Sequence, residues 1–318
     1  MNKTTTLSLI LLSSLTIIGC SSDDKHQITY TTVKQSDGNV FDIPIETVYK
    51  DLSTPESVTI DSSYDIYVSN IGGSPSESHD LGFLTKNGRT VLTGLDDPKG
   101  MAIIADGKFA VLSDHPNIKL IDLDSMSVVQ SLPVESAGFL NDAVTLSENT
   151  ALVSDTGNGN VYKIEFYNQS ISYSTFITSQ QLNGNGVNGL DFDDSSLNLY
   201  LVTSSFGGNQ NQGHIYRVSL DSDLNLASEI SQLTPLILGN GNLDGIVVKN
   251  GKLIISDWEN DVNDSSIFIF DIGSNLLNYV ISGNFNSPAD IALDDNENLY
   301  IPEFKSGRVV KINLASLL

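Results

Sequence analysis

One pattern of apolar and polar positions occurs six times along the chain. Each copy opens with a short segment that holds a polar residue, continues into an apolar strand, and adds a second strand ending in a small polar pair. The six openings begin at Pro55, Pro98, Leu140, Val187, Leu243 and Pro288, about 42 to 56 residues apart. The second strands end at Ser69-Asn70, Ser113-Asp114, Ser154-Asp155, Thr203-Ser204, Ser256-Asp257 and Pro302-Glu303. The chain is therefore built from one repeated unit.

Each copy predicts a meander of short antiparallel strands. In the first copy, residues 58–61 and 65–68 predict a hairpin, because apolar residues alternate on both sides of a polar turn. Third strands are predicted at residues 119–121, 160–164, 214–218, 266–270 and 308–312, and weaker fourth strands at 90–92 and 173–177. Repeats of this length that hold several short strands are typical of β-propellers. We therefore expect an all-β fold, a six-bladed β-propeller.

The last copy ends at Leu318 after only three strands. We expect residues 43–50, which lie before the first opening, to supply its missing outer strand. A strand in that position closes the ring and removes an exposed sheet edge. The propeller is therefore expected to span residues 40–318.

The amino terminus has the pattern of a bacterial lipoprotein. Lys3 is followed by an apolar stretch, residues 7–18, that is too short to span a bilayer. Residues 15–20 resemble a lipobox and end in Cys20, the only cysteine, so an internal disulfide is excluded. We expect residues 1–19 to be a signal peptide, Cys20 to be lipidated, and residues 20–39 to form a flexible tether. Ser21 favours the outer membrane of the cell envelope, on its periplasmic or its outer side.

The net charge of −23 limits the partners. Nucleic-acid binding depends on neutralising phosphates with Lys and Arg, so an acidic chain argues against it. Such a surface attracts divalent cations, or it serves only to keep the protein soluble. We expect a monomer whose contact with the membrane is made by the lipid anchor alone.

Four of the six openings carry side chains with oxygen donors. In a four-stranded meander, the loop before the first strand and the turn after the second lie on one face. Glu56, Asn141, Asn188 and Asp244 are therefore expected to converge at one mouth of the central channel. Such donors suit Ca²⁺ better than Zn²⁺. The alternative is that each residue only makes local hydrogen bonds to the backbone.

Three further residues belong to the same face. His115 is a candidate to contact a substrate or move a proton, or it is a solvated turn residue. Trp258, the only tryptophan, either lines a substrate pocket or packs between blades. Lys99 takes the polar position of the second copy, where it contacts a substrate anion or pairs with Asp96 or Asp97.

The segments around these residues resemble the regucalcin/gluconolactonase (senescence marker protein) family of six-bladed propellers. The similar segments are Pro55-Glu56-Ser57, Phe139-Leu140-Asn141-Asp142, Val187-Asn188-Gly189-Leu190 and Leu243-Asp244-Gly245-Ile246. The resemblance implies that Glu56, Asn188 and Asp244 bind a divalent metal and that Asn141 contacts both metal and substrate. It also implies that Asp244 is the general base of a lactonase in which the ion polarises the lactone carbonyl.

One departure from the family concerns the substrate. The sugar lactonases carry an arginine two positions before the asparagine of the third copy, and here that position is Phe139. A more apolar lactone or ester is therefore expected. The function predicted from the sequence is a lipid-anchored, Ca²⁺-dependent hydrolase acting on such a molecule. The alternative is a non-enzymatic propeller that keeps its calcium for stability and serves as a binding or scaffold protein.

Overall fold

The computed structural model describes residues 29–74, 80–204, 213–233, 238–259 and 264–318. Within these ranges the chain consists of antiparallel strands and one short 3-10 helix, η1 (Ser179–Leu182). No helix among these residues is long and apolar enough to cross a membrane. Cys20 and the expected signal peptide lie outside the described residues.

Four sheets have four strands each, and each follows chain order from one edge to the other. The first holds β3 (Pro55–Ile60), β4 (Ile66–Asn70), β5 (Gly82–Lys86) and β6 (Arg89–Leu95). The second holds β7 (Pro98–Ile104), β8 (Phe109–Asp114), β9 (Asn117–Asp122) and β10 (Ser127–Pro133). The third holds β11 (Leu140–Ser147), β12 (Thr150–Asp155), β13 (Asn160–Tyr167) and β14 (Ser170–Ile177). The fourth holds β15 (Gly186–Asp193), β16 (Asn198–Ser204), β17 (Ile215–Ser219) and β18 (Ser231–Gln232).

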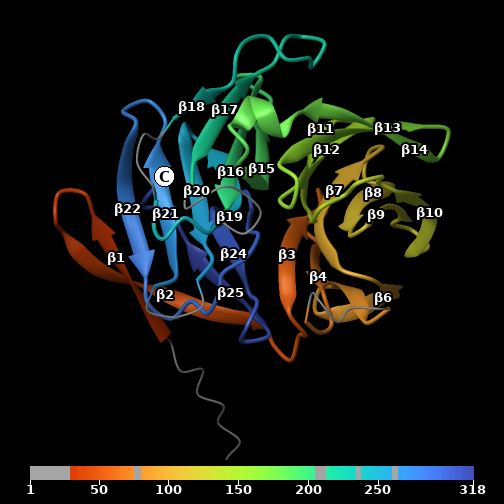
Figure 1. Cartoon of the computed structure of the whole chain (residues 1–318). Helices are drawn as coiled ribbons and strands as arrows, with labels where there is room; N and C mark the ends of the chain where they lie inside the picture. The colour runs from red at the N-terminus through yellow and green to blue at the C-terminus, as the bar shows by residue number, and fades with distance from the viewer. Residues whose placement is uncertain (1–28, 75–79, 205–212, 234–237, 260–263) are drawn as a thin grey trace, which may run out of the picture.

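The fifth sheet has nine strands and joins the two ends of the chain (Figure 1). One part of it is β19 (Leu243–Lys249), β20 (Lys252–Asp257), β21 (Ser266–Asp271) and β22 (Leu276–Ser282). The other is β23 (Ala292–Leu293), β24 (Asn298–Glu303), β25 (Arg308–Asn313) and β2 (Val40–Tyr49). Strand β1 (Thr29–Gln35) lies between β22 and β2 and is hydrogen-bonded to both.

The expected closing strand is confirmed. β2 pairs antiparallel with β25, with Glu46 opposite Lys311 and Thr47 opposite Val310. The outer edge of the last meander is therefore covered by a strand from the beginning of the chain, as the three-stranded last repeat predicts.

The expected flexible tether is wrong for its second half, because residues 29–35 form β1. Thr31 and Val33 are almost fully buried, and the Thr31 hydroxyl donates to the carbonyls of Ser282 and Gly283. This segment is mostly polar, so its composition suggested a tether. Its order comes instead from pairing with the edge of β22. The folded part therefore begins by residue 29 and not at residue 40.

The hydrophobic core lies between neighbouring sheets. One cluster joins Val111 and Ile118 of the second sheet to Leu140 and Val153 of the third, and similar clusters lie between the following sheets. Because each sheet is covered on both faces, its second strand is buried along its whole length, as in β4 and β8. This arrangement explains the continuous apolar runs of the second strands.

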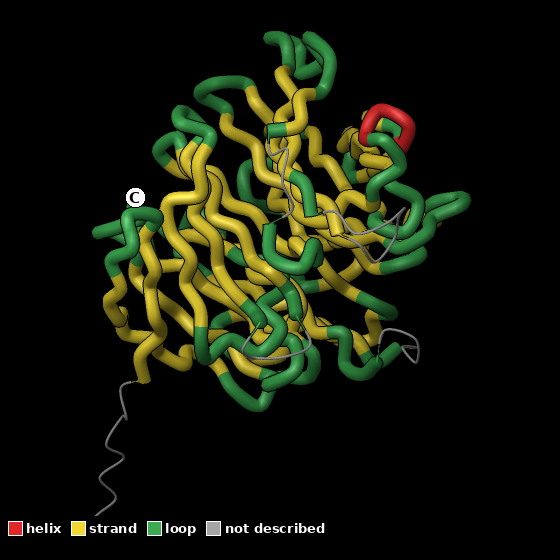
Figure 2. The backbone as a smooth tube through the Cα atoms, turned by 60° about the vertical axis from the view of Figure 1, so that its left-hand side comes forward, coloured by secondary structure: helices red, strands yellow, loops and turns green. Residues whose placement is uncertain are grey.

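The first strands of successive sheets surround a common axis. Strands β3, β7, β11, β15 and β19 contact one another in that order, and β23 and β24 contact β3. The views in Figures 1 and 2 show the sheets arranged around this centre. The fold is thus a ring of sheets of the propeller type, with the amino-terminal ends of the first strands gathered at one mouth.

Candidate functional site

A cavity of about 550 Å³ opens at the mouth where the first strands begin. Its polar lining is made by Glu56, Lys99, Asn141, Thr156, Asn188 and Asp244. Its apolar walls are made by Ile71, Phe139, Trp258, Ala289 and Phe304. All four residues expected to bind the cation therefore line one cavity, although they are supplied by four separate sheets.

A β-bulge aims each of these side chains into the cavity. The register of the first strand shifts between Leu140 and Ala143, between Val187 and Leu190, and between Leu243 and Ile246. β3 and β7 show the same irregularity next to Glu56 and Lys99. Bulged residues leave the ladder and turn their side chains away from the ordinary alternation. The polar side chains of these openings are thus directed into the cavity at the mouth of the channel.

The glycine that follows Asn188 lets neighbouring first strands approach closely. A Cβ atom at Gly189 would lie 2.3 Å from the carbonyl oxygen of Asp244, a distance that no side chain tolerates. Any larger residue at this position would push β15 and β19 apart. The glycine therefore keeps Asn188 and Asp244 within reach of one ligand.

The four expected cation ligands, Glu56, Asn141, Asn188 and Asp244, present oxygen atoms to the cavity. Glu56 Oε2 and Asp244 Oδ1 are buried without a hydrogen-bond partner. Asn141 Nδ2 donates to Thr156 Oγ1 at 3.1 Å, and Asn188 Nδ2 donates to the Leu243 carbonyl at 3.3 Å. With both amide nitrogens bound to the protein, the amide oxygens are left for a ligand. Buried unpaired carboxylate oxygens are costly unless a cation or a proton compensates them.

Burial and mutual repulsion raise the pKa of the carboxyl groups. Burial raises the pKa of Asp244 to about 7, and the charge of Asp142 adds to the effect. Burial also raises the pKa of Glu56 well above its usual range, and Asp244 adds to that shift. Behind the cavity, Asp142 and Asp290 are buried as well, and burial raises both pKa values. The site thus favours a proton or a cation over free negative charge.

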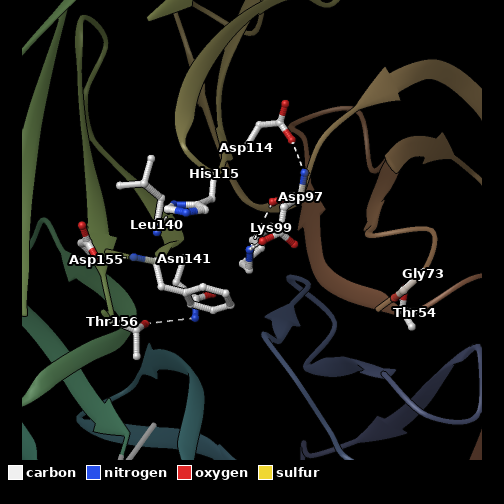
Figure 3. Close-up of polar contacts among 11 residues, drawn as sticks. Thr54, Gly73, Asp97, Lys99, Asp114, His115, Leu140, Asn141, Asp155 and Thr156 are labelled. Atoms are coloured by element: carbon white, nitrogen blue, oxygen red, sulfur yellow. Dashed lines mark hydrogen bonds and ion pairs between the residues drawn. The ribbon is translucent and has the colours of Figure 1, made fainter. Parts of the chain in front are cut away.

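Lys99 forms an ion pair with Asp97, which is one of the two roles that the sequence suggested for it. Its Nζ lies 2.6 Å from Asp97 Oδ2 and also donates to the Asp97 carbonyl. The same ammonium lies 4.2 Å from the centre of the Phe139 ring. Phe139 therefore forms a wall of the cavity and covers a buried ion pair (Figure 3 shows Lys99 beside Asp97).

Trp258 lines the cavity, whereas His115 does not lie on its lining. Trp258 packs edge-on against Phe304, with ring centres 6.0 Å apart. The His115 ring packs against Phe139, and its Nδ1 accepts a hydrogen bond from the Leu140 amide at 3.3 Å (Figure 3). Burial lowers the pKa of His115, and Lys99 lowers it further. His115 is thus placed to support the loop before Asn141.

The polar pairs that end the second strands act mainly on the backbone. Asp155 accepts hydrogen bonds from the amides of Gly138, Phe139, Gly157 and Asn158. Asp114 accepts in the same way from the Asp97 amide. These acids fix the loops that carry the cavity walls. In four copies the residue that follows the pair lines the cavity, namely Ile71, Thr156, Trp258 and Phe304.

The sequence singled out this following position in two copies, at His115 and Trp258, whereas Ile71, Thr156 and Phe304 become apparent only when the copies are aligned one residue beyond each polar pair. Asp142 and Asp290, the polar residue of the sixth opening, are also buried, and no sequence pattern predicted the burial of Asp142. In the part of the chain that the structure describes, no three His, Cys, Asp or Glu side chains gather at metal-binding spacing. The candidate set has two carboxylates, and its other two donors are amide oxygens.

No family model and no curated protein matches the chain. Solved structures do. The calcium-binding protein regucalcin from Agrobacterium tumefaciens superimposes with a TM-score of 0.63 at 14% identity, covering 85% of this chain and 93% of that one. A luciferin-regenerating enzyme gives 0.64 at 13% identity, covering 85% and 94%. The β-propeller domain of Swd1 from Myceliophteria thermophila gives 0.56 at 9% identity, covering 85% and 99%. The shared feature is the fold, which is an all-β propeller.

Proposed function

We propose that this protein is a six-bladed propeller of the regucalcin/gluconolactonase type that hydrolyses a lactone or a related ester with a bound divalent cation, Ca²⁺ in the first place. The sheet topology supports six blades. Four blades are the separate sheets, and two more lie in the nine-stranded sheet as β19–β22 and as β23–β25 with β2. In this view β1 is an extra strand that joins the last two blades.

The observation that carries the cation site is the orientation of its donors. Glu56 and Asp244 each bury an oxygen that has no partner. Asn141 donates its NH₂ group to Thr156, and Asn188 donates its own to the Leu243 carbonyl and to the Asp244 carboxyl. Glu56, Asn141, Asn188 and Asp244 would hold the ion, with water completing the oxygen shell that Ca²⁺ prefers. That the regucalcin structure is of a calcium-binding protein agrees with this proposal.

The charge of the cavity favours a divalent ion. Lys99 is neutralised by Asp97 at 2.6 Å. Glu56 and Asp244 are then left as two negative charges in a buried site. A doubly charged cation balances them, and it stabilises the ionised form of both groups against the effect of burial.

Asp244 is the proposed base. When bound, the cation polarises the substrate carbonyl and stabilises the negative charge that develops on its oxygen. Asp244 accepts a proton from water, and the resulting hydroxide adds to the carbonyl carbon. The ring C–O bond then breaks, and the departing oxygen takes the proton back from Asp244 to give a hydroxy acid. A base that also binds the ion must keep one oxygen free for water.

The walls of the cavity favour a substrate with an apolar body. Ile71, Phe139, Trp258 and Phe304 surround the polar floor. Phe139 stands where the resemblance to sugar lactonases calls for an arginine, and the nearby ammonium of Lys99 is already engaged. Hydroxyl groups of a sugar-acid lactone would lose water here without gaining partners. An alkyl- or aryl-substituted lactone, or an aryl ester, fits better.

A panel of lactones and aryl esters tests the proposal. With saturating Ca²⁺, we expect apolar lactones to be hydrolysed faster than gluconolactone. The apolar walls bind an apolar substrate body, whereas they offer no hydrogen-bond partners to the hydroxyl groups of gluconolactone. EDTA should abolish the activity, and added Ca²⁺ should restore it. Rates equal to the buffer background for every substrate would refute the hydrolase and leave the calcium-stabilised binding propeller as the function.

We also propose the placement in the cell. Cys20 would carry the lipid, and residues 21–28 would connect it to β1, which is a shorter connection than the sequence suggested. The protein would then act at the outer membrane of the cell envelope, on a small molecule and as a monomer. Labelling with radioactive palmitate, lost in Cys20→Ala, tests the anchor.

A further inference from the structure

We propose that Thr156 is a positioning residue that holds Asn141 with its amide oxygen toward the cation. The inference rests on the proposed cation site. Thr156 is the residue directly after β12 and is 1% exposed. It touches no reacting group in this scheme and acts only through Asn141.

The hydroxyl of Thr156 lies between two blades. Its Oγ1 accepts a hydrogen bond from Asn141 Nδ2 at 3.1 Å and donates one to the Val187 carbonyl at 2.8 Å. Figure 3 shows Asn141 and Thr156 facing each other with this bond between them. Both side chains are buried, so water does not compete for either bond.

The direction of these two bonds decides which end of the Asn141 amide faces the cavity. A backbone carbonyl only accepts, so the single hydroxyl proton of Thr156 must point at Val187. The Thr156 oxygen then offers Asn141 only lone pairs. An amide oxygen placed against it would be repelled, and the NH₂ group is attracted. Asn141 Oδ1 is therefore directed to the cavity, where a cation requires an oxygen.

The two asparagines are anchored by the same rule. Asn188 Nδ2 donates to the carbonyl of Leu243, the residue before Asp244. Asn141 reaches the carbonyl of Val187, the residue before Asn188, through Thr156. Each amide is thus tied to the next first strand, directly in one case and through a hydroxyl in the other. Only the second tie passes through another side chain, that of Thr156, so only it can be removed without changing the asparagine itself.

The position of Thr156 itself is fixed by the backbone. Its amide donates to the Phe139 carbonyl at 2.9 Å. Its carbonyl oxygen lies 2.3 Å from where a Cβ atom at Gly186 would be, so the next blade packs directly against it. A valine, which has the same shape as threonine, is therefore expected to occupy the same place without the hydroxyl.

Calcium affinity measured by calorimetry tests the inference. Thr156→Val should weaken binding by about 10- to 100-fold, the usual effect of losing a group that orients a metal ligand. Thr156→Ser keeps the hydroxyl and should remain within about threefold of wild type. Thr31→Val is the matched control, because it removes a buried hydroxyl that binds only the Ser282 and Gly283 carbonyls. Equal affinities of Thr156→Val and wild type would overturn the proposal.

A second background separates orientation from general damage. Aspartate at position 141 has an oxygen at both ends, so one oxygen faces the cavity whichever way the side chain turns, and the Thr156 hydroxyl can donate to the other. In Asn141→Asp protein, adding Thr156→Val should therefore weaken calcium binding by clearly less than it does in the wild-type background. A loss as large as in the wild-type background would mean that Thr156 acts on the whole site, and would contradict a positioning role through Asn141.

One readout does not need the cation. The side-chain NH₂ protons of Asn141, observed by nuclear magnetic resonance, should exchange slowly with solvent in wild type and quickly in Thr156→Val. If wild type binds no calcium but shows this difference, the proposed function fails and the orienting role stands. If exchange is equally fast in both proteins, the orienting role fails whatever the calcium affinity.

Discussion

Asp244→Asn is expected to lower kcat/KM for the best lactone by about 1,000-fold or more, because it removes the base and one charged cation ligand together. The protein should remain folded. Asp244 is buried with an unpaired oxygen, and burial raises its pKa to about 7. A neutral amide at this position removes the unfavourable burial of a negative charge. In EDTA the variant should therefore unfold at the wild-type temperature or above it.

Steady-state kinetics with saturating Ca²⁺ and thermal unfolding in EDTA check both parts. Asp223→Asn, which changes an exposed acid that does not line the cavity, is the control and should behave as wild type. Retention of turnover within about tenfold of wild type would show that another group is the base. A large fall in the unfolding temperature would show that Asp244 is instead a structural residue.

Asp155→Ala is expected to cause the largest loss of stability, about 4 kcal/mol. Four backbone amides donate to this fully buried carboxylate, and alanine leaves them without an acceptor. Two of them belong to Gly138 and Phe139, just before Asn141. The variant should therefore also lose the wall of the cavity and bind calcium more weakly than its stability alone predicts.

Urea unfolding in EDTA measures the effect. Asp122→Ala is the matched control, because Asp122 also accepts bonds from backbone amides, those of Asp124 and Ser125, but at an exposed turn. It should cost less than about 1 kcal/mol. Equal losses in the two variants would contradict the view that the buried carboxylate organises the loop.

The repeat predicted the sheets well because each blade obeys the same local rules. Alternating apolar residues and polar turns are recorded in every copy, and the closing pair of β2 with β25 followed from a missing strand. Strand β1 was not predictable in this way. Its residues are mostly polar, and it is ordered by the edge of β22, a contact between positions about 250 residues apart.

The cavity was predicted only in part, because only some of its residues stand at repeated positions of the sequence. The four expected cation ligands could be found because Glu56, Asn141, Asn188 and Asp244 stand at equivalent places in their copies of the repeat. The bulges that aim them, and the hydroxyl of Thr156 between two blades, depend on contacts across the ring. His115 follows the polar pair of its blade as Trp258 does, yet its ring packs against Phe139, and Phe139 is the one that lines the cavity.

Terbium luminescence sensitised by Trp258 tests the cation site most directly. Tb³⁺ replaces Ca²⁺ at oxygen sites, and the only tryptophan lines the same cavity as the four ligands. Excitation at the red edge of tryptophan absorption should give a 1:1 titration that Ca²⁺ displaces. The signal should be lost in Asp244→Asn and in Trp258→Phe, and of these two only Trp258→Phe should still bind calcium. Absence of sensitised emission from wild-type protein, or its persistence in Asp244→Asn, would contradict a cation held by these residues.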